Sequence, residues 1–215
     1  GKMAARLHVE VATVFDVIKL YERVTGGTAS GRETILNRLF IALIKKETAE
    51  QAIHFAHEAI EMHGGNGYIE DFVTPRLLRD AQVLTVWEGT ANILGLELIR
   101  LVNKFEAHRL FIDEMRNRLV VINDSEMKKA LSVELNALTT DLTEFAAFDN
   151  ALQTFEAKSL MKRMAYLYES VVALEWAMKH GGKFEKLAEI YIEDTWSLRN
   201  VGDEMKTVAY FDQII

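Results

Sequence analysis

A carboxylate, a glycine and a hydroxyl stand together where a helical pattern begins, at Glu88, Gly89 and Thr90. The Thr90 hydroxyl and the nearby backbone N–H groups could face an anion such as a phosphate, because the start of a helix carries unpaired donors and a partial positive charge. Taken alone, Glu88 is typical of a turn residue or of a charge at the start of a helix. These three residues therefore indicate a site without naming its reaction.

Two further groups precede this segment. Gly64, Gly65 and Gly67 follow the end of a long helical pattern, and glycines there permit close approach of another group to the backbone. Because this Gly-Gly-x-Gly run does not follow a strand, it is not the dinucleotide-binding fingerprint of a Rossmann unit, and alone it is typical of a helix cap and turn. The Arg-x-x-Arg-Asp run after Pro75 is, by itself, typical of a surface ion-pair cluster.

The elements that must position these groups are helices. Proline occurs once, at Pro75, and nine of the twelve glycines lie at or before Gly95, so long stretches lack helix breakers. Hydrophobic residues recur at three- and four-residue steps, and alternation with the period of a strand is nowhere sustained. The fold class is therefore all-α, with helices predicted over residues 3–25, 32–62, 89–105, 106–122, 125–147, 150–180 and 184–214, a loop at 25–31, and a turn with a short helix at 68–80.

Composition narrows the classes of function. Hydrophobic residues make up 49% of the 215 residues, which is enough for a core, and the lack of cysteine excludes disulfide and thiolate–metal frameworks. A net charge of −7 without a basic block argues against nucleic-acid binding by this chain. No apolar run approaches the roughly 18–20 residues of a membrane span, and the first three residues are not a signal peptide.

Three separated blocks agree, in order and spacing, with one known family. They are EMHGGNGY at 61–68, PRLLRDA at 75–81 and WEGTANI at 87–93. Together they resemble the C-terminal domain of the acyl-CoA dehydrogenase family, in which a Gly-Gly-x-Gly-Tyr run, an Arg-x-x-Arg-Asp stretch and a Tyr/Trp-Glu-Gly-Thr motif follow one another. The resemblance covers about residues 1–105 and implies a four-helix up-and-down bundle there, while the helical pattern of residues 106–215 predicts a C-terminal helical extension.

The resemblance implies a reaction and a role for Glu88. Complete members of the family bind FAD and oxidise the Cα–Cβ bond of an acyl-CoA thioester, and a carboxylate removes the α-proton while the β-hydride goes to the flavin. In many members this carboxylate belongs to the Glu-Gly-Thr motif, so it corresponds here to Glu88, and Gly89 leaves room for the ligand or the flavin. Such chemistry needs a dry site, because desolvation raises the pKa of a carboxylate base.

The same resemblance implies a cofactor and partners. Thr90 and Asn92 would contact FAD, while Gly64 and Gly65 would lie against the adenosine half of FAD from a neighbouring subunit. The expected partners are an acyl-CoA substrate, an electron-transfer flavoprotein or another acceptor, and further copies of the chain in a homo-oligomer built through the helical bundle. The expected location is the cytoplasm of a bacterium or the mitochondrial matrix of a eukaryote.

Some residues depart from the family pattern. Glu61 stands where the family usually has Gln, near the adenine or pyrophosphate of FAD, so its carboxylate has to be paired or turned away from the phosphates. His63 replaces a common aromatic or aliphatic residue. Trp87 and Asn92 favour the branch related to the alkylation-response flavoprotein, in which dehydrogenation is weak. A flavoprotein of that branch is therefore one alternative function.

Residues 106–215 extend beyond the usual end of the family. One apolar face is predicted at Phe105, Leu110, Met115 and Leu119. A second core is predicted from the large apolar residues Phe145, Phe148, Phe155, Met161, Met164, Tyr168, Trp176 and Trp196. We expect this extension to pack on the bundle or to build a subunit interface, and a membrane-surface or partner-binding role is the alternative.

Two rival functions belong to other classes. A non-catalytic helical interaction or oligomerisation module is an alternative, because the chain lacks the β-domain that holds the flavin in the family; we expect a fragment of a longer protein, inactive alone. His54, His57, Glu58 and Glu61 share a helical face, which suggests a di-metal carboxylate protein. That class needs Glu-x-x-His on two helices, and no histidine here has an acidic residue three positions before it, so we expect no metal site.

Overall fold

The computed structural model describes residues 1–200 and 202–215. Its elements are α1 (Lys2–Thr25), α2 (Gly31–His63), α3 (Gly65–Tyr68), α4 (Thr74–Val83), α5 (Ala91–Phe105), α6 (Ala107–Val121), α7 (Glu126–Ala147), α8 (Asn150–His180), α9 (Lys183–Thr195), α10 (Lys206–Ala209) and α11 (Phe211–Ile214). The all-α prediction is confirmed, since the described residues contain no β-strand. None of these helices is both long and apolar enough to cross a membrane.

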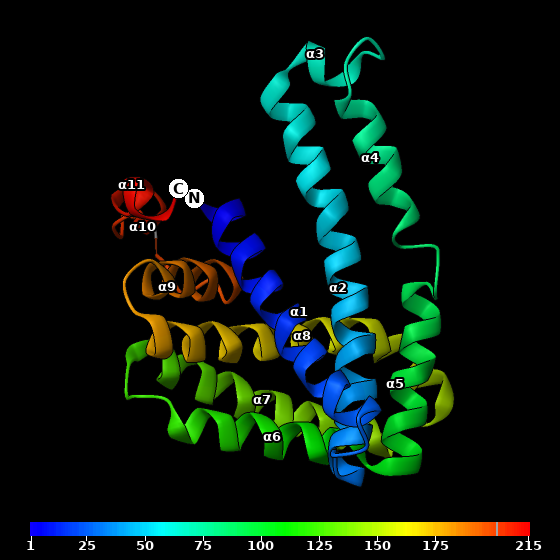
Figure 1. The fold of residues 1–215 in the computed structure, drawn as a ribbon. Helices are drawn as coiled ribbons and strands as arrows, with labels where there is room; N and C mark the ends of the chain where they lie inside the picture. Colours follow the sequence, from blue (N-terminus) through cyan, green and yellow to red (C-terminus); the bar gives the residue numbers. More distant parts are fainter. Residues whose placement is uncertain (201) are drawn as a thin grey trace.

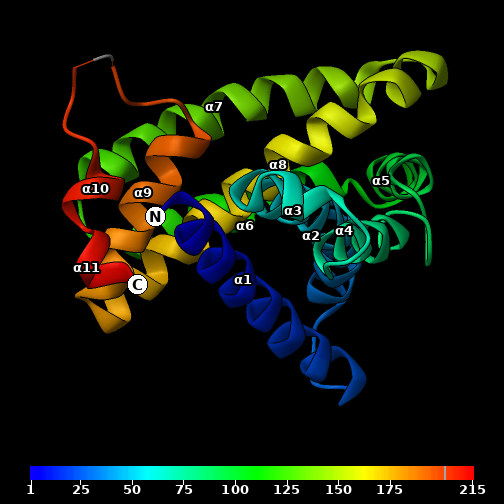
Figure 2. The ribbon, with the colours of Figure 1, turned by 90° about the horizontal axis from the view of Figure 1, so that it is seen from above.

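The helices form two groups that cross each other (Figure 1). In this view α1 runs downward, α2 runs upward, and α4 with α5 returns downward, so neighbouring helices of residues 1–105 alternate in direction. The extension, α6 to α9, runs across them, and α8 packs against α1, α2, α5, α7 and α9. From above, α8 lies between α7 and α1 (Figure 2). The predicted helical bundle with a helical extension is confirmed.

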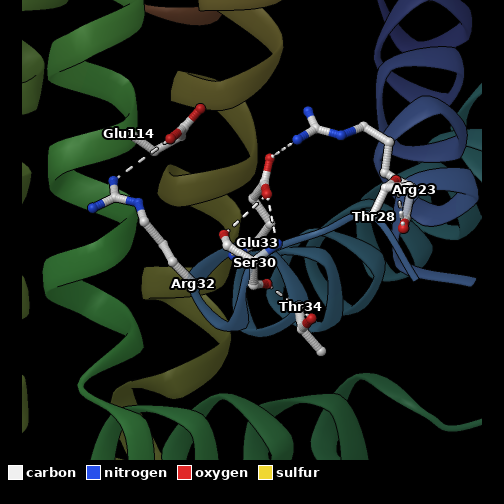
Figure 3. Close-up of polar contacts among 7 residues, drawn as sticks. All are labelled: Arg23, Thr28, Ser30, Arg32, Glu33, Thr34 and Glu114. Atoms are coloured by element: carbon white, nitrogen blue, oxygen red, sulfur yellow. Dashed lines mark hydrogen bonds and ion pairs between the residues drawn. The ribbon is translucent and has the colours of Figure 1, made fainter. Parts of the chain in front are cut away.

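Short-range polar contacts fix the turn between α1 and α2, as Figure 3 shows. The Ser30 hydroxyl accepts a hydrogen bond from the Glu33 N–H at 3.2 Å, and the Ser30 N–H donates to the Glu33 carboxylate at 2.8 Å, which is a capping box. The same carboxylate pairs with Arg23 near the end of α1, while Arg32 reaches Glu114 of α6 at 3.5 Å. The start of α2 is thereby held against both α1 and α6.

One hydrophobic core joins the bundle to the extension. Phe40 of α2 stacks on Tyr168 of α8 with ring centroids 4.1 Å apart, and it meets Phe111 of α6 edge to face at 6.2 Å. Burying an aromatic side chain such as Phe contributes roughly 1.5–3 kcal/mol, so these contacts stabilise α2, α6 and α8 together. The predicted boundary between residues 105 and 106 falls at the turn from α5 to α6, where Glu106 has a left-handed backbone with φ 50°.

An ion-pair network also links the two groups of helices. Arg118 of α6 donates to the Asp16 carboxylate of α1 at 2.9 Å and to the Glu175 carboxylate of α8 at 2.7 Å. The Tyr168 hydroxyl donates to Asp16 at 2.7 Å. Burial by itself would lower the pKa of Arg118, but the bonds to Glu175 and Asp16 outweigh it and raise this pKa above its ordinary value. The guanidinium therefore stays charged and neutralises two partly buried carboxylates.

Two sequence predictions for the extension are wrong. The helix predicted over 184–214 ends at Thr195; the Trp196 indole N–H donates to the Ser170 hydroxyl of α8 at 3.0 Å, and Ser197 has a left-handed backbone with φ 53°. Residue 201 of that prediction lies outside the described residues. Phe155, predicted in the second core, is 79% exposed, because the face of α8 that packs inward here carries Gln153, Ala157 and Leu160. The other members are buried or partly buried: Phe145, Phe148, Met161, Met164, Tyr168, Trp176 and Trp196.

Candidate functional site

The Glu-Gly-Thr motif lies in the turn that joins α4 to α5. After α4 the chain continues in tight turns, and the N–H groups of Val86 and Trp87 both donate to the Val83 carbonyl, at 3.0 and 3.1 Å. Glu88 then has a left-handed backbone with φ 53°, and Gly89 follows at φ 107°. A left-handed conformation costs a residue with a side chain roughly 1–2 kcal/mol, so the turn holds Glu88 in a strained conformation.

The Glu88 side chain is exposed. Large apolar side chains are also exposed on this turn and on the helices at either side of it, and they are Val83, Val86, Trp87, Ile93 and Leu96. Several exposed apolar side chains on one stretch of the chain are typical of a surface that another molecule covers. A ligand lying on this surface would remove water from the carboxylate, which strengthens it as a base.

Lys45 of α2 connects the two ends of this turn. Its ammonium donates to the Leu84 carbonyl at 3.2 Å and also to the Gly89 carbonyl. The residue is partly buried, and hydrogen bonds from a charged donor are stronger than those between neutral groups. Sequence reasoning missed Lys45, because 44 residues separate it from Gly89 and the only signal is a lysine directly after an apolar run.

The start of α5 offers donors close to Glu88. Thr90 is the residue that precedes the helix, with an extended backbone at ψ 165°, and its hydroxyl makes no capping hydrogen bond. Thr90 and Asn92 are both exposed. The hydroxyl, the first N–H groups of α5 and the Asn92 amide are therefore available to a ligand, and they fit an anionic or polar group such as part of FAD.

Gly64 and Gly65 lie at the far end of α2. A Cβ atom at either residue would meet no atom within 4 Å, so both leave their backbone accessible. Gly67 is the glycine that packing requires, because a Cβ there would lie 2.3 Å from the Ile60 carbonyl oxygen. Gly64 follows Lys45 by 19 residues along one helix, or about 28 Å. The structure therefore does not bring these glycines together with the Glu-Gly-Thr turn of the same chain.

The charged residues near the glycines are paired. Glu61 lies 3.5 Å from the His57 ring one turn earlier, a contact that is an ion pair only when the imidazole is protonated. Arg79 binds Glu70 through two hydrogen bonds of 2.8 and 3.0 Å, as a surface ion pair. His57, Glu58 and Glu61 place one ligand atom each within 4.8 Å of one another. All three belong to one stretch of one helix, whereas a di-metal carboxylate centre takes its ligands from several helices.

A second group of titratable residues lies inside the molecule, where α1, α2 and α8 meet. Glu10, Glu47 and Glu169 are 6%, 1% and 0% exposed. Burial raises the pKa of Glu10 to about 8, with Arg6 opposing the shift and Glu47 adding to it. Burial and the charge of Glu47 also raise the pKa of Glu169 well above its ordinary value, against a hydrogen bond from Tyr191. Sequence reasoning missed this group, because its members come from three distant helices.

Comparison with known proteins gives the family. Residues 1–102 match the model of the family described as "Acyl-CoA dehydrogenase, C-terminal domain". Residues 1–102, just under half of the chain, are thus similar to an acyl-CoA dehydrogenase C-terminal domain. The predicted resemblance is confirmed, and the matched segment contains all three blocks on which it rests, including the Glu-Gly-Thr turn.

Individual relatives extend the comparison beyond residue 102. Acyl-CoA dehydrogenase family member 11 of Caenorhabditis elegans is 32% identical over 141 residues, which cover 64% of this chain and 23% of that protein. The putative acyl-CoA dehydrogenase AidB of Escherichia coli (strain K12) is 34% identical over 104 residues, which cover 48% of this chain and 18% of that protein. The chain thus spans less than a quarter of the length of either relative.

A solved structure shares the fold of the extension as well. The crystal structure of Caenorhabditis elegans ACDH-11 in complex with C11-CoA matches with a TM-score of 0.78 at 24% identity. The match covers 94% of this chain and 35% of that chain. The match includes most of residues 106–215. ACDH-11 therefore shares the fold of the extension as well as that of residues 1–105.

Proposed function

We propose that this chain is the C-terminal domain of an FAD-dependent acyl-CoA dehydrogenase in which Glu88 removes the α-proton of the thioester. The conformation of Glu88 carries the proposal. In a domain similar to this family's, the glutamate of the Glu-Gly-Thr motif has a strained left-handed backbone and is exposed in a segment with several exposed apolar side chains. A carboxylate with this surrounding becomes a stronger base when a ligand covers it.

The residues of the turn then have separate roles. When bound, FAD supplies the acceptor for the β-hydride. The Glu88 carboxylate takes the α-proton: the α-carbon–hydrogen bond breaks, an O–H bond forms on Glu88, and the electron pair left on the α-carbon becomes part of the new Cα–Cβ double bond as the hydride leaves the β-carbon. Gly89 keeps the space beside Glu88 free of a side chain, and Trp87 helps to exclude water from it.

Two pairs of residues are assigned to FAD. Thr90 and Asn92 are exposed at the start of α5, beside Glu88, and they contact the cofactor of the same site. Gly64 and Gly65 contact the adenosine half of FAD bound by a neighbouring subunit. Their distance of about 28 Å along α2 from the Glu-Gly-Thr turn supports this assignment to a second site.

A homo-oligomer follows from this division of the site between subunits. An apolar stripe on α1 supports it, because the side chains of Leu7, Val11, Phe15 and Ile18 are 42–61% exposed. The substrate is an acyl-CoA thioester, supported by the C11-CoA that ACDH-11 holds in a shared fold. An electron-transfer flavoprotein or another acceptor reoxidises the flavin, in the cytoplasm of a bacterium or in the mitochondrial matrix.

A second candidate is a flavoprotein of the alkylation-response branch. Trp87, directly before the Glu-Gly-Thr motif, and Asn92 favour it, as the sequence resemblance implies. The two candidates differ in one measurable property, which is reduction of the bound flavin by an acyl-CoA.

The test is an anaerobic titration of the full-length parent protein with saturated acyl-CoAs of several chain lengths, followed by flavin absorbance. We expect one chain-length class to bleach the oxidised flavin. Glu88→Gln should slow bleaching by about 10²–10⁴-fold while FAD stays bound, since a positioned general base contributes that much.

Glu106→Gln is the matched control, because Glu106 also has a left-handed backbone but lies at the turn from α5 to α6. It should bleach like the wild type. Bleaching by Glu88→Gln at the wild-type rate would place the base elsewhere. A bound flavin that no acyl-CoA reduces would favour the alkylation-response branch, and absence of flavin would favour a non-catalytic interaction module.

A further inference from the structure

The clearest contact around the Glu-Gly-Thr turn comes from a residue outside the motif. From it we infer that Lys45 is the positioning residue for Glu88: its ammonium fixes the turn so that the carboxylate is held where the α-proton of the substrate has to be. The inference rests on the proposed function, and it adds a residue of α2 to the machinery of that site.

The two hydrogen bonds of Lys45 bracket Glu88. The Leu84 carbonyl precedes Glu88 by four residues and the Gly89 carbonyl follows it directly, and both accept from the same ammonium. Within the turn, the remaining backbone hydrogen bonds are local, such as that from the Thr85 N–H to the Gln82 carbonyl at 3.3 Å. Lys45 therefore ties both ends of the turn to α2, whose neighbouring residues 42–44 are buried in the core.

The strained backbone of Glu88 makes this tie necessary. A turn that holds a non-glycine residue at φ 53° tends to relax unless its surroundings fix it. Relaxation would rotate the Cα–Cβ bond of Glu88 and swing the carboxylate away from its place. A catalytic group displaced by about 1 Å loses on the order of 10²-fold in rate, so a tie at both ends matters for the reaction.

The chemistry of the acceptors distinguishes Lys45 from an ordinary surface lysine. Both acceptors are neutral carbonyls, whereas the next residue, Lys46, is 4% exposed and binds the carboxylate of Glu50 at 2.9 Å. Lys46 pairs with Glu50, whose side chain is 39% exposed. Lys45 instead binds two backbone carbonyls of the turn, and the three N–H donors of its ammonium are enough for both hydrogen bonds.

The experiment compares Lys45→Met, Lys45→Arg and the control Lys104→Met, which removes an exposed lysine at the end of α5. Hydrogen exchange of the 215-residue chain is followed by mass spectrometry, with the segment 84–90 resolved from the rest. In the full-length parent, the rate of flavin reduction, the acyl-CoA concentration at half saturation and the FAD content are measured for the same variants.

We expect Lys45→Met to increase amide exchange in 84–90 by at least about tenfold, while exchange in α1 and α8 stays as in the wild type. Flavin reduction should slow on the order of 10²-fold, with the half-saturating acyl-CoA concentration and the FAD content changed by less than about threefold. Lys45→Arg keeps a charged donor and should restore most of both properties, and Lys104→Met should change neither.

Unchanged exchange in 84–90 for Lys45→Met would overturn the inference, and so would equal loss of rate in Lys45→Arg and Lys45→Met. The exchange measurement does not depend on the reaction. If acyl-CoA fails to reduce even the wild-type parent while Lys45→Met still loosens the turn, the proposed function fails and the tie between Lys45 and the turn stands.

Discussion

Glu10→Gln should make the chain more stable at alkaline pH, because Glu10 is a buried carboxyl that the folded state keeps protonated. Its pKa is about 8 in the folded chain against 4.5 for an ordinary glutamate, mainly because of burial. The folded state thus binds the proton more tightly than the unfolded state. The resulting stability is fully present below about pH 4.5 and is lost as the pH rises to about 8. Each pH unit in this window lowers the free energy of unfolding by at most about 1.4 kcal/mol.

Between about pH 4.5 and about pH 8, the free energy of unfolding falls by at most about 5 kcal/mol because of Glu10. Relaxation of the buried charge toward Arg6 reduces the expected fall to roughly 2–4 kcal/mol. Glutamine cannot ionise, so the free energy of unfolding of the variant should not fall for this reason. Urea unfolding of the chain and of Glu10→Gln, followed by far-ultraviolet circular dichroism in steps from about pH 5 to about pH 9, measures it as the difference between the two curves.

That difference isolates Glu10 from the other groups that titrate in the window. Glu169 of α8, whose pKa burial raises, is present in both proteins, as is His108, whose pKa burial lowers. Glu22→Gln is the matched control, since Glu22 is exposed on the same helix. Its curve should stay parallel to that of the wild type. If the curve of Glu10→Gln also ran parallel to the wild type across this pH range, the buried proton on Glu10 would be refuted.

Two further substitutions test the packing. Gly67→Ala should destabilise the chain by about 1–3 kcal/mol, because its Cβ would lie 2.3 Å from the Ile60 carbonyl oxygen. Gly65→Ala is the control: its Cβ meets no atom within 4 Å, so the thermal midpoint should stay unchanged. Equal midpoints for the two variants would contradict this account. Arg118→Met should cost about 2–3 kcal/mol in urea unfolding, less than the roughly 3–5 kcal/mol of a fully buried pair, because its two carboxylate partners are 27–30% exposed. Arg116→Met, which removes an exposed arginine of the same helix, should cost less than about 0.5 kcal/mol, and an equal cost for both would show that the network contributes nothing.

The sequence predicts the helices well where local signals are strong. Ser30 and Glu33 form a capping box, and α2 begins next to them as expected. The helix predicted from 150 to 180 is observed with the same bounds. The prediction fails where a distant contact ends a helix: the indole of Trp196 binds Ser170, and α9 ends one residue earlier. Propensity contains no information about such a partner.

The candidate site shows the same limit. The Glu-Gly-Thr motif consists of three adjacent residues, so the sequence alone is enough to single out Glu88. It is not enough for Lys45, because this lysine reaches the turn only through the pairing of α2 with the segment after α4. The roles of Thr90, Asn92, Gly64 and Gly65 stay predictions, although the structure leaves all four exposed.

Backbone strain alone does not mark the site. Glu88, Glu106 and Ser197 all have a left-handed backbone, with φ between 50° and 53°. Glu106 lies at a helix end, where a left-handed residue commonly completes the turn, and Ser197 follows a helix that a distant contact has ended. Glu88 differs because a glycine at φ 107° follows it, nearby residues of the same segment have exposed apolar side chains, and Lys45 binds the backbone on both sides. A charged group from another helix thus maintains the strained backbone of Glu88, while the carboxylate stays accessible to a ligand. This combination is expected of a residue whose position matters for function.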